Sequence, residues 1–93
     1  MSGPHQTAIL VHGALQRAGY SMAAGPNSPG YIVAEVKTLF GQSSALEVSH
    51  IPLGDDPDAH ARAYYRALAS DQSLAGLAIQ FDAQPYPKVH VRG

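Results

Sequence analysis

Apolar residues recur with a helical period in the first part of the chain. Between residues 5 and 18 they fall on one side of a 3.6-residue wheel and comprise Ala8, Leu10, Val11, Ala14, Leu15 and Ala18. This spacing predicts an amphipathic helix, because positions three and four apart share one face of a helix. Gly19 predicts the end of this helix, since glycine readily adopts the left-handed conformation of a C-terminal cap.

A second helix is predicted after the acidic segment 55–58. Asp56 precedes Pro57; an aspartate can cap the free backbone N–H groups, and proline suits the first helical position. Arg62 and Ser70 lie on the polar side, and the helix ends at about Ser70. The residues that share its inner stripe are His60, Ala61, Tyr64 and Leu68.

Alternation of apolar and polar residues predicts the strands. They cover residues 20–24, 31–37, 46–51, 77–82 and 88–92. The order of elements is therefore α-β-β-β-α-β-β. Because consecutive strands lack crossover helices, we expect an α+β fold in which a small, mainly antiparallel sheet has two helices on one face.

The composition indicates one folded domain spanning residues 1–93. The chain is 45% hydrophobic, and six basic and seven acidic residues leave a formal net charge of −1. A nucleic-acid-binding surface needs clustered basic residues, so nucleic acid is not an expected partner. No apolar run is long enough to cross a membrane, and residues 1–6 lack the cationic start of a signal peptide. With no cysteine in the chain, we expect a cytoplasmic protein.

The five histidines raise the question of a metal site. His5 and His12 are two helical turns apart, about 10 Å, which is too far to share one ion. Asp56 and His60 are four residues apart, but Asp56 is assigned to the helix cap. We therefore expect no metal ion and no other cofactor.

Catalytic and nucleotide-binding motifs are missing from the chain. Gly25 and Gly30 have the spacing of a phosphate-binding loop, but Tyr31 and Ile32 follow where Lys and Ser or Thr are required. The sequence also lacks the Gly-x-Ser-x-Gly elbow of serine hydrolases. These absences favour a non-catalytic binding or regulatory module acting through a protein–protein surface, such as an inhibitor or adaptor encoded by a mobile element.

A small-ligand-binding protein or enzyme is the alternative. His50 and His90 lie on different strands and Tyr86 lies in a turn between two prolines. If the fold brings these three residues together, they could line a pocket for a small ligand.

The last strand carries the predicted contact with a protein partner. Lys88, His90 and Arg92 share one face, opposite Val89 and Val91. At a sheet edge, the unpaired backbone groups of this strand would accept an added strand, and the cationic row would select an acidic partner or support a homodimer. The further candidate contact residues are Tyr86, Tyr65, Arg62 and Arg66.

Overall fold

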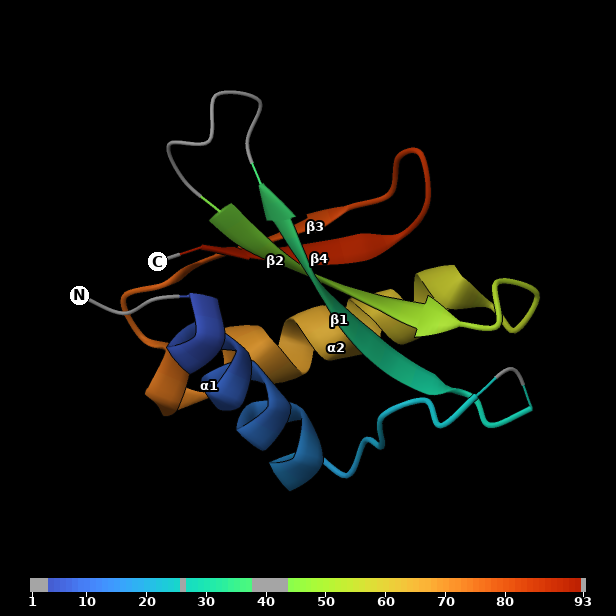
Figure 1. Cartoon of the computed structure of the whole chain (residues 1–93), viewed down its shortest axis with the longest axis horizontal. Helices are drawn as coiled ribbons and strands as arrows, with labels where there is room; N and C mark the ends of the chain where they lie inside the picture. The colour runs from blue at the N-terminus through green and yellow to red at the C-terminus, as the bar shows by residue number, and fades with distance from the viewer. Residues whose placement is uncertain (1–3, 26, 38–43, 93) are drawn as a thin grey trace.

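The computed structural model describes residues 4–25, 27–37 and 44–92. In chain order the elements are α1 (Pro4–Arg17), β1 (Gly30–Lys37), β2 (Ser44–Ile51), α2 (Pro57–Ala69), the short 3-10 helix η1 (Gln72–Leu74), β3 (Ala78–Asp82) and β4 (Lys88–Arg92). The four strands form one antiparallel sheet in the order β1-β2-β4-β3. Both α-helices lie on the same side of this sheet (Figure 1). The predicted α+β class and the placement of the helices are confirmed.

β4 lies inside the sheet and not at its edge. Val89 pairs with Val48 of β2 on one side and with Phe81 of β3 on the other. The prediction of an edge position for the last strand is therefore wrong, and the edge strands are β1 and β3. Val89 and Val91 are almost completely buried, and a strand with neighbours on both sides buries apolar side chains more fully than an edge strand does.

Residues 20–24 do not form the additional strand that their pattern predicts. Met22 makes a single parallel bridge with Tyr31, and the Ala23 amide donates to the Tyr31 carbonyl at 2.9 Å. Parallel strands need a connection of about a dozen residues or more, whereas only the short loop before Gly30 joins these two segments. The pairing therefore cannot extend beyond the start of β1.

Local signals at the helix ends act as the sequence predicts. Gly19 adopts a positive φ of 94°, and the amides of Gly19 and Tyr20 donate to the carbonyls of Gln16 and Leu15, each at 3.0 Å. These two bonds satisfy carbonyls that the end of α1 leaves without helical partners. At the start of α2, the Asp56 carboxylate accepts a hydrogen bond from the Ala59 amide at 3.3 Å, as expected of a cap.

The hydrophobic core fills the space between the helices and one face of the sheet. Its buried members are Val11, Ala14, Leu15, Tyr31, Leu46, Val48, Tyr64, Leu68, Leu74, Val89 and Val91. No described helix covers the opposite face of the sheet, and the β3–β4 loop rises on that side (Figure 1). The side chains available to a ligand or partner are therefore divided between this open face, the sheet edges and the outer surfaces of the helices. Among the described helices, none has the length and apolar character needed to span a membrane.

Candidate functional site

Two histidines and an aspartate meet where β2 ends and α2 begins. His50 points from β2 toward the helices, and its Nε2 lies 3.1 Å from Oδ2 of Asp55. His60, in the first turns of α2, places its own Nε2 3.6 Å from the same oxygen. The two imidazole rings are stacked, with centroids 3.8 Å apart. Together with Tyr64, which bonds to His50, we call this group the histidine cluster.

Tyr64 orients the ring of His50, the buried histidine of the cluster. Its hydroxyl lies 2.7 Å from Nδ1 of His50, and the His50 side chain is only 3% exposed. Burial, followed by the nearby Tyr20, Asp55 and Tyr31, raises the pKa of Tyr64 to about 12. The hydroxyl therefore stays protonated at neutral pH, and it can donate to Nδ1 of the His50 tautomer that carries its proton on Nε2 and faces Asp55.

We expect the Tyr64→Phe variant to lose an alkaline transition in the pH dependence of its free energy of unfolding. The variant leaves Nδ1 of His50 buried without its partner, which costs about 1–2 kcal/mol of folding free energy at neutral pH. Because the pKa of Tyr64 is raised from 10.0 to about 12 in the folded state, its contribution is present in full below pH 10 and is lost as the pH rises through 12.

The measurement is urea denaturation of both proteins over this pH range. The difference in free energy of unfolding between the wild type and Tyr64→Phe should be constant below pH 10 and shrink above it. A constant difference up to pH 12 would contradict the assigned environment of Tyr64.

The structure brings two predicted contact residues, Tyr86 and Lys88, into a polar group on the open face of the sheet. Tyr86 donates a hydrogen bond to the Glu47 carboxylate. Lys88 donates to the carbonyls of Gln84 and Tyr86 and lies 3.6 Å from Asp82. Lys88 is thus buried, and its ammonium group is engaged by acceptors of its own domain.

His90 and Arg92 continue along this face of β4. Nε2 of His90 lies 3.7 Å from Oδ2 of Asp82, and its buried Nδ1 has no hydrogen-bond partner among the described residues. Arg92 is exposed, and the part of the chain that the structure describes offers it no ion pair. Only the far end of the predicted cationic row therefore presents a charge to solvent.

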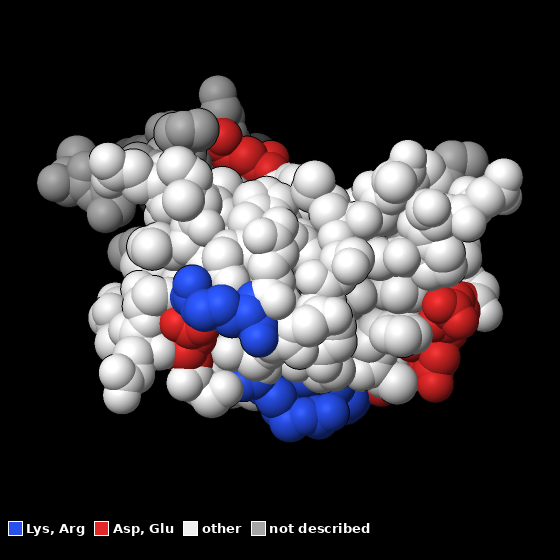
Figure 2. Space-filling view, turned by 90° about the horizontal axis from the view of Figure 1, so that it is seen from below, with Lys and Arg blue, Asp and Glu red and all other residues white. Residues whose placement is uncertain are grey.

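The remaining predicted contacts lie on α2, on the other side of the molecule. Arg62 and Arg66 are exposed and Tyr65 is half-buried against the core. Arg62 donates to Asp58 at 2.7 Å, and its guanidinium lies 4.5 Å from the centre of the Phe81 ring. Most of the face in Figure 2 is neither acidic nor basic. Because Lys88, His90 and Arg92 point to the open face and α2 packs on the other face of the sheet, the predicted contact residues do not form one continuous surface.

The predicted pocket at His50, His90 and Tyr86 does not form. Glu47 pairs with His90 on the open face, whereas His50, three residues further along β2, contacts Tyr64 on the helical side. Alternation along a strand puts residues an odd number apart on opposite faces. The two histidines are thus separated by the sheet itself.

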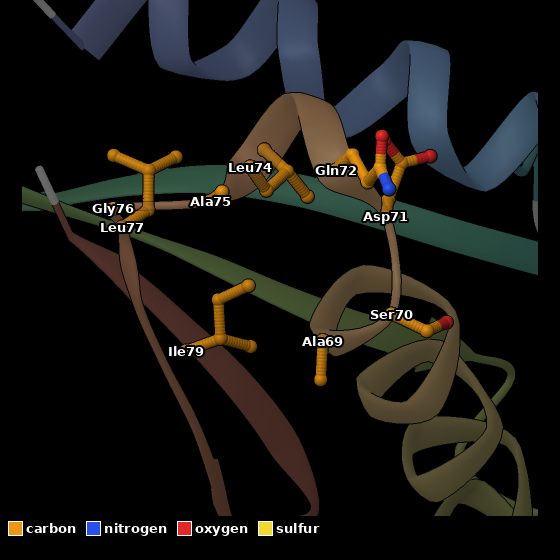
Figure 3. A pocket seen from close by; sticks show the side chains of 9 residues that line it. All are labelled: Ala69, Ser70, Asp71, Gln72, Leu74, Ala75, Gly76, Leu77 and Ile79. Atoms are coloured by element: carbon orange, nitrogen blue, oxygen red, sulfur yellow. The ribbon is translucent and has the colours of Figure 1, made fainter.

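An open hollow of about 370 Å³ lies between the end of α2, η1 and the start of β3. Its lining residues are Ala69, Ser70, Asp71, Gln72, Leu74, Ala75, Gly76, Leu77 and Ile79 (Figure 3). Hydrogen bonds from Ser73, followed by one from Arg17, lower the pKa of Asp71, which keeps its carboxylate ionised at the rim. Ser70 and Gln72 add further polar atoms to its apolar lining, and the hollow borders the edge strand β3.

Sequence reasoning missed both the histidine cluster and the hollow. The partner of His60 is Asp55 and not Asp56, whose carboxylate caps α2. The even spacing of His50, Asp55 and His60, each five residues apart, was the available signal. The sequence held no signal for the hollow, because the position of the hollow depends on where η1 packs.

Comparison of this chain with protein families, with curated proteins and with solved structures found no match.

Proposed function

We propose that this protein is a non-catalytic protein-binding module whose partner at the edge of the sheet is a second copy of the same chain. The observation that carries the proposal is the edge strand β3, which has a neighbour on one side only among the described strands. Its sequence from Ala78 to Asp82 is complementary to itself in the antiparallel direction. Strand addition would supply backbone hydrogen bonds, and the side-chain pairs would fix the register.

β3 is a better docking edge than β1. The outer side of β1 is already engaged at Tyr31, whose amide donates to Ser21 at 3.2 Å while its carbonyl accepts from Ala23. Further along β1, Glu35 is exposed on the helical side of the sheet, opposite Leu46. An inward-pointing charge of this kind protects an edge against strand addition. β3 has no proline, and its central residue, Gln80, is uncharged and exposed.

An antiparallel register centred on Gln80 suits both copies. It pairs Ile79 of each chain with Phe81 of the other, on the helical side of both sheets, and such aromatic–β-branched pairs stabilise a sheet by about 0.2–1 kcal/mol each. Asp82 then faces the small Ala78, so the like charges of the two chains do not meet. The hollow beside Ile79 offers room for the Phe81 ring of the second copy. A two-fold axis through Gln80 would relate the two copies, so that the assembly ends at a dimer.

Charge changes at Gln80 test this interface. In Gln80→Lys two ammonium groups would face each other across the two-fold axis, and in Gln80→Glu two carboxylates would do so. We expect each change to weaken the dimer about fivefold or more, since like charges directly opposite each other destabilise a strand pair. An equimolar mixture of the two variants should restore it as a heterodimer. Sedimentation equilibrium gives the dissociation constants.

The matched control is Gln16→Lys, the same charge change at an exposed position of α1, which should leave the dimer unchanged. A wild type that is monomeric at every concentration, or a Gln80→Lys variant that dimerises like the wild type, would refute the proposal. A mixture that fails to re-associate would refute the central position of Gln80.

The charge distribution supports a protein partner over nucleic acid. Arg17 pairs with Asp71 and Arg62 with Asp58, and Lys88 is neutralised within the domain. Few described basic groups are left for phosphates. Within this proposal the module acts in the cytoplasm as a regulator, of the inhibitor or adaptor type that mobile elements encode.

A further inference from the structure

We propose that His50, Asp55 and His60 bind a Zn²⁺ ion at the junction of β2 and α2. The ligand atoms would be Nε2 of each histidine and a carboxylate oxygen of the aspartate. Among the described His, Asp and Glu side chains, these three bring their ligand atoms within 4.8 Å of one another. The proposal does not depend on the dimer at β3, because none of these residues belongs to that strand.

The spacing of the ligand atoms fits zinc. Zinc binds nitrogen and carboxylate oxygen at about 2.0–2.2 Å, so two ligands at a tetrahedral angle lie about 3.3–3.5 Å apart. Oδ2 of Asp55 lies 3.1 Å from Nε2 of His50 and 3.6 Å from Nε2 of His60. These distances therefore match an ion between the three atoms once the His60 ring has left its stack with the His50 ring.

His50 has the outer-shell support that ligating histidines have in known metal sites. Its second nitrogen, Nδ1, lies 2.7 Å from the buried Tyr64 hydroxyl. When Nε2 binds the ion, the ring carries its proton on Nδ1 and donates to the tyrosine oxygen, which can accept as well as donate. His50 is therefore held in the orientation that points Nε2 at Asp55.

His60 and Asp55 supply the adaptable side of the site. Their side chains are 40% and 49% exposed, so the His60 ring can rotate out of its stack with His50 to aim Nε2 at the ion. The same exposure lets water reach a fourth position, as in zinc sites with three protein ligands. A mixed imidazole–carboxylate set favours zinc over magnesium or calcium, which prefer oxygen ligands.

Neighbouring carboxylates do not compete for the ion. Asp56 accepts the hydrogen bond that caps α2, and Asp58 pairs with Arg62 at 2.7 Å. They provide matched controls, because they lie in the same acidic segment but outside the cluster.

The test is calorimetric titration of the metal-free full chain with Zn²⁺, with Co²⁺ absorption as a report on coordination. We expect one ion per chain and a melting temperature that rises with added Zn²⁺. His60→Ala and Asp55→Asn each remove one ligand, and we expect each to weaken binding by at least about 100-fold. Tyr64→Phe removes the outer-shell partner and should weaken it by about 10–100-fold.

The controls are His90→Ala, a histidine on the opposite face of the sheet, and Asp58→Asn. Both should bind Zn²⁺ with wild-type affinity. Equal affinity in the wild type, His60→Ala and Asp55→Asn would overturn the proposal, as would loss of binding in His90→Ala. Because His60 and Asp55 are partly exposed, circular dichroism should show both ligand variants folded, so that lost binding is not lost structure.

Discussion

Replacing Leu68 with Ala is expected to lower the free energy of unfolding by about 3–4 kcal/mol, the largest effect of any single change considered for this protein. Leu68 is 0% exposed and packs at the centre of the core between α2 and the sheet. Removing its isobutyl group loses the transfer free energy of buried apolar surface and leaves a cavity. A domain of this size has few other layers that could close such a cavity.

The matched control is Leu53→Ala. Leu53 follows β2 and is 61% exposed, so the same truncation there should cost less than about 0.5 kcal/mol. Urea denaturation of the wild type and both variants gives the comparison. Similar losses at Leu53 and Leu68 would mean that the packing of α2 on the sheet is wrongly described.

Gly30→Ala is expected to destabilise the fold by about 3 kcal/mol, at the upper end of the range for overpacking. A methyl group added at Gly30 would meet backbone atoms of the segment that crosses the start of β1, namely the Ser21 carbonyl oxygen and, at 2.7 Å, the Ala23 nitrogen. Backbone atoms cannot rotate aside as a flexible side chain can. Either this segment or the start of β1 must therefore move, with loss of the hydrogen bonds around Tyr31.

Gly54→Ala is the control for this substitution. A methyl group at Gly54 has no described atom within 4 Å, and Gly54 does not have the positive φ that disfavours alanine. The free energy of unfolding of the Gly54→Ala variant should stay within about 0.5 kcal/mol of the wild-type value. A Gly30→Ala protein as stable as Gly54→Ala would show that the close approach at Gly30 does not exist.

Gly30 also shows why sequence reasoning was incomplete. In the sequence it belongs to a loop rich in glycine and proline, and a turn explains it fully. In the fold it is the first residue of β1, where the absence of a side chain admits a neighbouring backbone. Such proximity depends on the path of the chain nine residues earlier, which no local pattern encodes.

Lys88 shows in the same way that a local pattern does not encode tertiary contacts. Alternation along β4 correctly puts it on the face opposite Val89, and such a face is commonly solvated. The hydrogen bonds of its ammonium group depend on the tertiary structure, because the β3–β4 loop folds back and its carbonyls accept them. A side chain assigned to partner binding is thereby engaged within its own domain.

By itself, the sequence determined the α+β class, both helices with their caps, and which side of β2, β3 and β4 faces the core. These features depend on neighbours within about one helical turn or two strand positions, as at Asp56 and Gly19. Only the tertiary structure decided that β4 lies between β2 and β3 and that His50 meets Asp55 and His60. A two-residue period assigns a side chain to a face but not to a neighbour, because strand order and loop paths follow from burying the whole core at once.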